Sequence, residues 1–422
     1  MPVMPKIKEF DYIEQKCFYL GVFFLSSALP ISAILFLIPL IFSFLEINLL
    51  KIKDKFNLIL LIIGGFMILQ NINLLISQNS FNINDKINNL IDLANWIPFF
   101  LLFIIFQKFL KTSTQRKHFS RILIIGSFPI FFSCILQAWF NVYGPFETLN
   151  GLIVWFQKPI EENHNGITGL FSNQNYTGIW LTAILPFLIA EQRLSRNNKL
   201  LNISLIILDI YLVFLTTSKN AFFSLFIILI MLFKIRSRLF ITIFGSLGSY
   251  LLAINILNKL DFQNINLVYF PIYEKLSSFN FFSSSRYEIY KISSKLILQK
   301  PLLGWGKSIF PDLYLSNGGT YNIEHTHSIP LELGFNYGLI IAAALILLIS
   351  YLVINCSIKI FKMPKDDDRV FFNKCWIVST LIILISQLND ITYYDGKISL
   401  LIWILLSGTK CIFNDKDLYK VI

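Results

Sequence analysis

The sequence alternates between long apolar runs and short polar segments that are mostly cationic. A helix that crosses a bilayer needs about 20 mostly apolar residues, because its backbone N–H and C=O groups must be satisfied internally. The pattern therefore predicts an all-α, polytopic membrane protein. Pro30 either separates the first two apolar runs or kinks one long helix, so eleven or twelve transmembrane helices are expected. The predicted spans are 17–29, 31–45, 56–76, 94–110, 122–141, 169–190, 200–216, 220–233, 239–257, 333–355, 371–387 and 398–412.

Charge favours the higher count. The 422 residues are 55% hydrophobic and 14% charged, with a formal net charge of +11. With about twelve spans and both termini cytoplasmic, most of the 36 Lys and Arg fall in short cytoplasmic segments, as the positive-inside rule requires. Eleven spans would move the cationic cluster at 6–16 outside. We predict a single integral membrane domain, 1–422, whose cations mark topology, with the lipid bilayer and not nucleic acid as a partner.

Two external loops are expected, at 142–168 and at 258–332. The second is far longer than a connector needs to be, and such loops often carry function. Within this long loop, Ser285 is suited to cap a helix, Ile289, Ile292 and Leu296 follow at three- and four-residue spacing, and Pro301 ends the run. This pattern predicts an amphipathic helix that lies on the outer membrane surface.

Arg286 falls in the first turn of that helix. A helix N-terminus offers unpaired N–H groups and a partial positive charge, so an added guanidinium makes a site suited to a phosphate or diphosphate. The alternative is an interfacial helix whose cations meet lipid headgroups. The following Gly304-Trp305-Gly306 lacks the context of a nucleotide site, and we expect it to shape the loop.

Glu324-His325-Thr326-His327 precedes the next span. Two histidines at i and i+2 in extended chain share a face, but no third strong metal ligand beyond Glu324 is evident, so no metal site is predicted. A neutral imidazole is instead suited to take a proton from an attacking hydroxyl. A histidine that is hydrogen-bonded at a helix start is the structural alternative.

Five segments in this order resemble the O-antigen ligase and polymerase family: 169–178, 216–221, Ser285-Arg286, 301–306 and His327-Ser328. The resemblance covers about 168–350. It implies a glycosyltransferase without metal or other cofactor, on the periplasmic face of the bacterial inner membrane. The donor would be an undecaprenyl-diphosphate-linked glycan. Ligases pass the glycan to the lipid A-core, and polymerases pass it to another, growing glycan.

The resemblance also implies roles for single residues. His327 would be the base that deprotonates the acceptor hydroxyl, with His325 as its neighbour in substrate binding. Arg286 would hold the donor diphosphate and stabilise it as it leaves, together with Lys219. The family often has Arg where Lys219 stands, and Lys keeps the charge but loses the bidentate fork. The family commonly has Asn where Ser328 follows the catalytic His.

Asn173 and Asn175 open a predicted span beside the expected site. They are substrate-binding candidates that orient sugar hydroxyls or the diphosphate, or else they cap the helix.

A membrane carrier, including the bicarbonate-uptake role attached to some relatives of the family, is the alternative from another class. Its main support is Asp209, an ionisable group near the middle of a predicted span. The enzyme instead requires Arg286, Lys219 and His327 to converge. The acidic run at 366–368 lies among cations in a predicted cytoplasmic loop, so we interpret it as a solvated cluster and not as a metal site.

Overall fold

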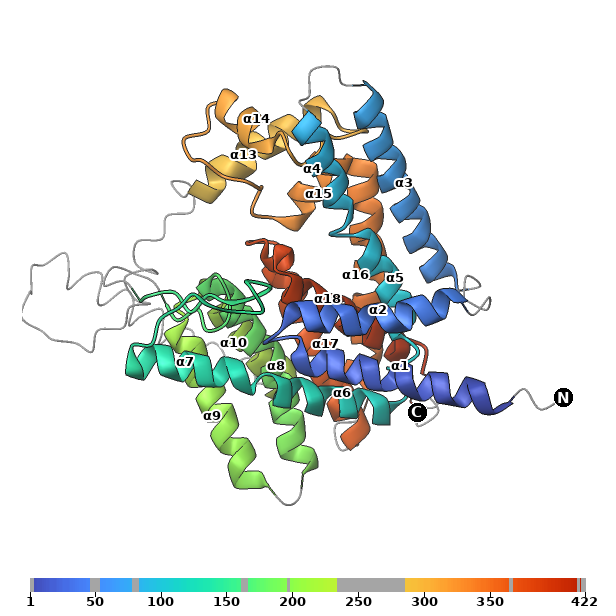
Figure 1. Ribbon diagram of the computed structural model, residues 1–422, viewed down its shortest axis with the longest axis vertical. Helices are drawn as coiled ribbons and strands as arrows, with labels where there is room; N and C mark the ends of the chain where they lie inside the picture. Colours follow the sequence, from blue (N-terminus) through green and yellow to red (C-terminus); the bar gives the residue numbers. More distant parts are fainter. Residues whose placement is uncertain are drawn as a thin grey trace, which may run out of the picture.

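The computed structural model describes residues 4–45, 54–77, 83–160, 166–195, 198–233, 285–363, 367–415 and 418 (Figure 1). The predicted span at 239–257 lies outside these residues. The elements are α1 (Met4–Phe24), α2 (Leu29–Leu45), α3 (Lys55–Ser77), α4 (Ile83–Leu93), α5 (Ile97–Phe106), α6 (Ser113–Gly126), α7 (Phe128–Phe140), β1 (Phe146–Thr148), β2 (Ile153–Trp155), α8 (Gln174–Leu194), α9 (Lys199–Leu215), α10 (Lys219–Phe233), α13 (Ser285–Gln299), α14 (Phe310–Ser316), α15 (Ile329–Tyr337), α16 (Leu339–Lys362), α17 (Asp368–Ser386), the 3-10 helix η1 (Thr392–Tyr394) and α18 (Gly396–Phe413).

Every predicted span that falls within the described residues contains a helix. Six helical segments are long and apolar enough to cross a membrane, namely Lys55–Ile76, Ile87–Phe106, Ser113–Phe140, Leu339–Lys362, Asp368–Ser386 and Gly396–Phe413. Two shorter apolar helices cover Leu29–Ser43 and Lys219–Phe233. The helical membrane class is confirmed, and the total of about twelve spans stays a prediction.

Pro30 follows a break between two helices. It lies in the first turn of α2, where its missing N–H leaves no helical hydrogen bond unmade. The two helices pack side by side (Figure 1), and the Ser32 hydroxyl donates to the Gly21 carbonyl at 2.7 Å. The chain therefore turns before Pro30, as the twelve-span prediction requires.

The centre of the bundle is formed by α8, α17 and α18. Trp180, Trp376 and Trp403 contribute one fully buried indole from each of these helices. A Cβ on Gly408 would lie 2.0 Å from the Trp376 ring, so the glycine allows this close packing. The Ser379 hydroxyl donates to the Ala183 carbonyl at 2.6 Å and ties α17 to α8. α17 thus packs against both α8 and α18.

Gly338 interrupts the predicted span at 333–355, so the prediction of one continuous helix was wrong there. Gly338 has φ +85°, a conformation outside the helical region, and it lies between α15 and α16. A Cβ at this position would lie 2.3 Å from the Leu302 carbonyl oxygen. The apolar pattern runs through the break, which is why periodicity alone did not reveal it.

The amphipathic helix predicted after Ser285 is confirmed as α13, and its place on the outer membrane surface stays a prediction. Ile289, Ile292 and Leu296 are buried in a cluster with Phe310 of α14 and Phe335 of α15. The apolar face therefore packs against protein, because the chain after Pro301 folds back over it. In Figure 1, α13, α14 and α15 form the upper part of the molecule, beside α4 and α16.

The predicted external loop at 142–168 contains a short hairpin that the all-α prediction missed. β1 and β2 pair antiparallel, with Glu147 opposite Val154. The Trp155 indole N–H donates to the Ser27 carbonyl at 2.6 Å, which fixes the hairpin to the turn between α1 and α2. Strands of three residues are too short to give a clear alternating pattern.

Ion pairs connect the segments that the positive-inside rule assigns to the cytoplasmic side. They join Arg116 to Asp415, Lys108 to Glu14, Arg193 to Asp368, Lys410 to Asp54 and Arg121 to Glu191. In α8, α17 and α18 the paired residues lie at the end of the helix opposite to Asn175, Asp390 and Tyr394, respectively. The structure thus gathers these predicted loops at one end of the bundle.

Candidate active site

The histidine segment forms a tight turn before α15. His327 has φ +55°, a left-handed conformation that costs a non-glycine residue about 1 kcal/mol. The Thr326 N–H donates to Glu332 Oε2 at 2.9 Å, and the Glu332 N–H donates to the Ser328 carbonyl at 2.8 Å. The Ile329 N–H donates to the Gln387 carbonyl at 3.0 Å. These bonds hold the turn against the end of α17 and offset its strain.

Asp390 is the central partner of this turn. Its Oδ1 lies 3.3 Å from Nδ1 of His327. An ionised carboxylate only accepts hydrogen bonds, so this contact places the imidazole proton on Nδ1 and the lone pair on Nε2. Burial raises the pKa of Asp390, but the hydrogen bond from His327 and the charge of Arg286 outweigh it, and the pKa lies below its ordinary value. Asp390 is therefore ionised at neutral pH.

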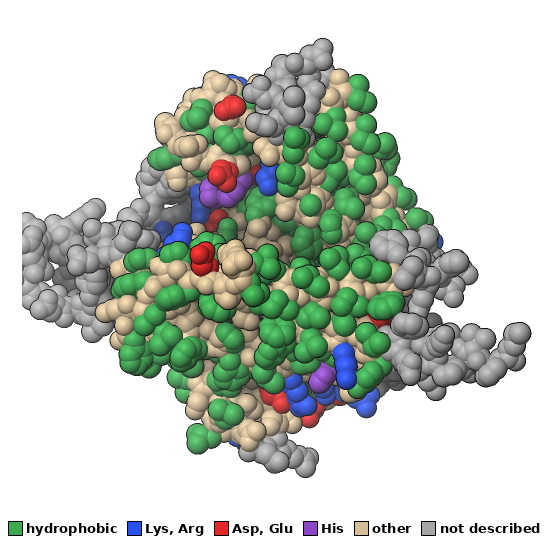
Figure 2. Space-filling view, viewed as in Figure 1, with side chains coloured by type: hydrophobic (Ala, Val, Ile, Leu, Met, Phe, Trp, Pro, Cys, Tyr) green, Lys and Arg blue, Asp and Glu red, His purple; other side chains and the backbone are tan. Residues whose placement is uncertain are grey.

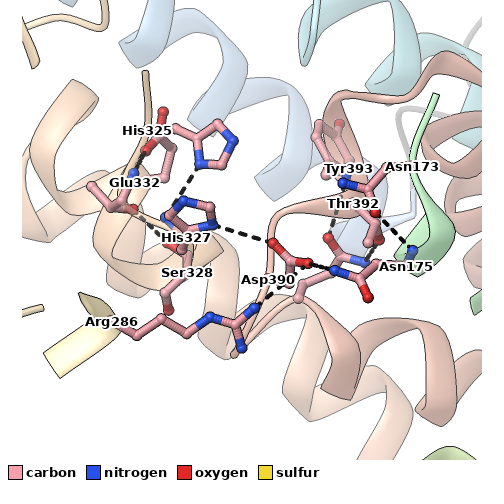
Figure 3. A network of polar contacts seen from close by, with 12 residues as sticks. Asn173, Asn175, Arg286, His325, His327, Ser328, Glu332, Asp390, Thr392 and Tyr393 are labelled. Atoms are coloured by element: carbon pink, nitrogen blue, oxygen red, sulfur yellow. Dashed lines mark hydrogen bonds and ion pairs between the residues drawn. The ribbon is translucent and has the colours of Figure 1, made fainter. Parts of the chain in front are cut away.

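Arg286 reaches the same carboxylate from the first turn of α13. Its Nη2 lies 3.8 Å from Asp390 Oδ2, and its side chain is 41% exposed. One turn later, the Tyr290 hydroxyl donates to the carbonyls of His327 and Leu388, each at 3.4 Å. The buried face of α13 thus fixes the guanidinium beside the histidine turn (Figure 3).

Asn175 completes the contacts to Asp390. Its Nδ2 donates to Asp390 Oδ2 at 2.8 Å, which joins the start of α8 to the site (Figure 3). Asn173 caps α8, since its side chain accepts from the Asn175 N–H at 2.8 Å. Asn173 is therefore a helix cap, whereas Asn175 contacts the carboxylate of Asp390.

Lys219 begins α10, two residues after Thr217, which has φ +52°. Partial burial and the nearby Arg286 guanidinium lower the pKa of Lys219. The positive charge of Arg286 therefore reaches Lys219. A pair of neighbouring cations is suited to a dianionic group.

His325 stands next to His327. Its Nδ1 accepts the His327 backbone N–H at 3.3 Å, and the two ring centroids are 4.4 Å apart. Burial and the neighbouring His327 lower the pKa of His325 to about 4. His325 is therefore neutral at physiological pH.

The Gly304-Trp305-Gly306 segment shapes the loop, as expected. The Trp305 N–H donates to the Phe335 carbonyl at 2.7 Å, and the Gly306 N–H donates to the Asn336 carbonyl at 3.2 Å. The segment thus runs along the end of α15 as backbone support for the histidine turn. Figure 2 shows histidine side chains in a hollow between the upper and lower parts of the molecule, with charged side chains around them.

Asp390 is the site residue that the sequence reasoning missed. It lies in the short segment between two predicted spans, 63 residues after His327. The sequence did contain a signal for Asp390. It is an acidic residue in a turn that the predicted topology places on the same side of the membrane as the histidines.

Asp209 and the acidic run at 366–368 have other surroundings. Asp209 is fully buried on α9. Asp367 caps α17 and Asp368 pairs with Arg193, while Asp366 lies outside the described residues. Within the described ranges, His, Cys, Asp and Glu form no group of three that could hold a metal.

Residues 204–349 match a family model described as O-antigen ligase. The match confirms the resemblance inferred from the sequence. It includes Lys219, Arg286, His325 and His327, and it ends before Asp390. Comparison with curated proteins gives no match to the chain.

Proposed function

Because residues 204–349 carry the match to the O-antigen ligase family, we propose that this membrane protein transfers a glycan from undecaprenyl diphosphate to an acceptor hydroxyl. The observation that carries the proposal is the convergence of His327 and Arg286 on Asp390, from three separate segments of the chain. Glycosyl transfer from a diphosphate needs a base that takes the proton of the acceptor hydroxyl and a cation that stabilises the leaving diphosphate. The two residues that meet at Asp390 are of these two types. The region of family resemblance, 168–350, would supply most of the site within one integral membrane domain.

The reaction would be a single displacement. Nε2 of His327 accepts the proton of the acceptor hydroxyl while the hydroxyl oxygen forms a bond to the anomeric carbon of the donor. The bond from that carbon to the diphosphate oxygen breaks, and its electron pair leaves with the diphosphate. Arg286 and Lys219 stabilise the charge that develops on the leaving group. A positioned general base contributes a factor of about 10² to 10⁴ to such a rate.

Asp390 would be a positioning residue in this reaction. Its carboxylate keeps the His327 proton on Nδ1 and stabilises the imidazolium that forms when Nε2 takes the second proton. Asn175 and Arg286 hold the carboxylate in place from the other side. The step needs no metal, since the two cations neutralise the leaving group.

The proposed location is the periplasmic face of the bacterial inner membrane, with both termini cytoplasmic. Asn175 lies at the start of α8, whereas the ion-paired Glu191 lies near its end. Asp390 follows the end of α17, whereas the ion-paired Asp368 begins it. The site and the cation-rich loops therefore belong to opposite ends of these helices. The positive-inside rule assigns the cation-rich end to the cytoplasm.

Two acceptors fit this site: the lipid A-core, for a ligase, and a growing glycan, for a polymerase. Deletion of the gene, with complementation by wild type, His327→Ala or Arg286→Ala, separates them through analysis of surface and carrier-linked glycans. Carrier-linked polymer without its lipid anchor indicates a ligase, and accumulation of one repeat unit indicates a polymerase. Lys295→Ala, which changes an exposed cation of α13 away from the site, is the control and should complement fully.

The carrier alternative makes a different prediction for Asp209. Both of its carboxylate oxygens are buried and without a hydrogen-bond partner among the described residues. A carrier that binds protons or ions there would lose solute uptake in Asp209→Asn. The enzyme proposal expects normal glycans from the same variant. Normal glycans after gene deletion, together with defective uptake, would reject the glycosyltransferase.

A further inference from the structure

The histidine turn is flanked by two ion pairs of the same construction. Arg286 pairs with Asp390, and their side chains are 41% and 10% exposed. Lys307 pairs with Asp92 at 3.3 Å, and their side chains are 29% and 3% exposed. In both pairs the carboxylate is the buried member and the cation is the member that reaches the surface. Each pair therefore presents a positive charge outward.

Lys307 belongs to the side of the turn away from Arg286. In Figure 3, Arg286 and His325 lie on opposite sides of His327. The Lys307 ammonium lies 3.7 Å from the centroid of the Tyr394 ring, and that ring is 5.9 Å from the ring of His325. The positive charge of Lys307 also contributes to the low pKa of His325. The second cation thus lies beside His325.

The backbone around Lys307 is fixed. Gly306 has φ +84°, and a Cβ there would lie 2.8 Å from the amide nitrogen of Asn89. The Ser308 N–H donates to Asn89 Oδ1 at 3.1 Å. The lysine is therefore presented from a loop that is held on α4 and on the end of α15.

Asp92 does not depend on Lys307 alone. Its Oδ2 accepts from the Tyr337 hydroxyl at 2.8 Å, and its Oδ1 accepts from Asn95 Nδ2 at 3.0 Å. The carboxylate keeps these two hydrogen bonds when the flexible ammonium turns toward a bound anion. Lysine is suited to this because its charge sits on a stem with several rotatable bonds.

His325 adds a neutral donor at the same place. Since its Nδ1 accepts the His327 N–H, its own proton is on Nε2. An N–H donor beside an ammonium is suited to an acceptor oxygen, such as that of a hydroxyl, next to an anionic group.

We propose that Lys307 and His325 form the acceptor subsite, and that the acceptor carries a phosphate or carboxylate on the sugar whose hydroxyl reacts. The inference rests on the proposed function, which places the donor diphosphate at Arg286 and Lys219. His327 lies between the two cationic regions. Its Nε2 can then take the acceptor proton while the two anionic substrates stay apart.

The test compares acceptors that differ only in charge. The protein is reconstituted in vesicles with the host's lipid-linked glycan as donor. The acceptor fraction from the same host is used native, after phosphatase treatment, or after carbodiimide amidation of its carboxylates. Removal of the relevant charge should lower kcat/KM of the wild type about tenfold, and the effective treatment identifies the anion. The preference should shrink in 0.5 M salt, because salt screens exposed charges.

The matched variant is Asp92→Asn with Lys307→Met, which removes both charges and leaves no unpaired buried carboxylate. It should transfer to native and neutralised acceptors at equal rates, with the donor KM of the wild type. Lys307→Arg should keep the preference.

Equal use of all acceptors by the wild type would overturn the subsite, as would a charge preference that survives in the folded double variant. A raised donor KM in that variant would assign Lys307 to the donor and also overturn the inference. A different result would overturn the proposed function itself, namely that no acceptor supports transfer that depends on His327. If the double variant does not fold, the wild-type acceptor and salt comparisons still decide.

Discussion

Asp390 holds Nδ1 of His327 at 3.3 Å, across 63 residues of sequence and from the end of a different helix. This contact decides which nitrogen of the imidazole carries the lone pair. It also places the proposed base next to a carboxylate that Arg286 and Asn175 bind from the other side. The chemistry of the site therefore depends on the packing of α17 against the turn before α15.

Asp390→Asn should reverse the His327 tautomer. The amide can donate to Nδ1, which would move the imidazole proton to Nε2 and remove the base. We expect kcat to fall by about 10³-fold with little change in either KM. Asn389→Ala, at the exposed neighbouring position, should leave kcat unchanged. Steady-state transfer kinetics of the two variants measure this, and a KM defect without loss of kcat would contradict the positioning role.

Lys219→Arg should retain transfer activity. Arginine keeps the positive charge and adds a bidentate fork for a phosphate oxygen pair. Lys219→Gln should lower kcat/KM about tenfold, because the leaving diphosphate loses one of its two cations. Activity of each variant over a range of donor concentrations is the measurement. Full activity of the glutamine variant would remove Lys219 from the donor site.

The free energy of unfolding should decrease as the pH falls, because the folded protein disfavours protonated His325. Burial and His327 lower its pKa from 6.5 to about 4, so the unfolded chain binds more protons than the folded chain between these values. The part of the unfolding free energy that depends on neutral His325 is therefore fully present above about pH 6.5 and is lost as the pH falls toward 4. It amounts to at most about 3 kcal/mol. Apparent melting temperatures in detergent should decline more steeply between pH 7 and 5 for wild type than for His325→Asn, and equal slopes would contradict the assignment.

Gly304→Ala should displace the loop that carries Lys307. The glycine has φ +66°, and a Cβ would lie 2.7 Å from the Asn336 backbone. We expect a loss of about 2 kcal/mol in unfolding free energy, from strain and collision together. Gly318→Ala is the control, since its φ is +92° but no described atom lies within 4 Å of its Cβ. Only the Gly304 variant should combine lower stability with a weaker acceptor preference.

Much of this molecule follows from local pattern. A helix lies in each apolar run within the described residues, and the spacing of Ile289, Ile292 and Leu296 predicted α13 together with Arg286 in its first turn. The order of the motifs also indicated the family whose model matches residues 204–349, and it singled out His327 as the candidate base. These features depend on periodicity and on short segments, which a single sequence contains.

The missed features depend on contacts between distant segments. Asp390 acquires its role only because α17 ends beside the histidine turn. The apolar face of α13 looked membrane-bound because its covering residues, Phe310 and Phe335, follow later in the chain. Gly338 breaks a helix because a positive φ and the Leu302 carbonyl exclude a side chain. Hydrophobic periodicity contains none of this information.

The most direct test of the central claim is glycan transfer by purified His327→Ala protein. Vesicles would contain the protein, the host's lipid-linked glycan and its acceptor fraction, and the product would be measured as glycan released from the diphosphate carrier onto the acceptor. With the protein folded, as its melting temperature shows, we predict a loss of at least about 100-fold relative to wild type, the lower bound for a general base. Transfer by His327→Ala at the wild-type rate would contradict the account.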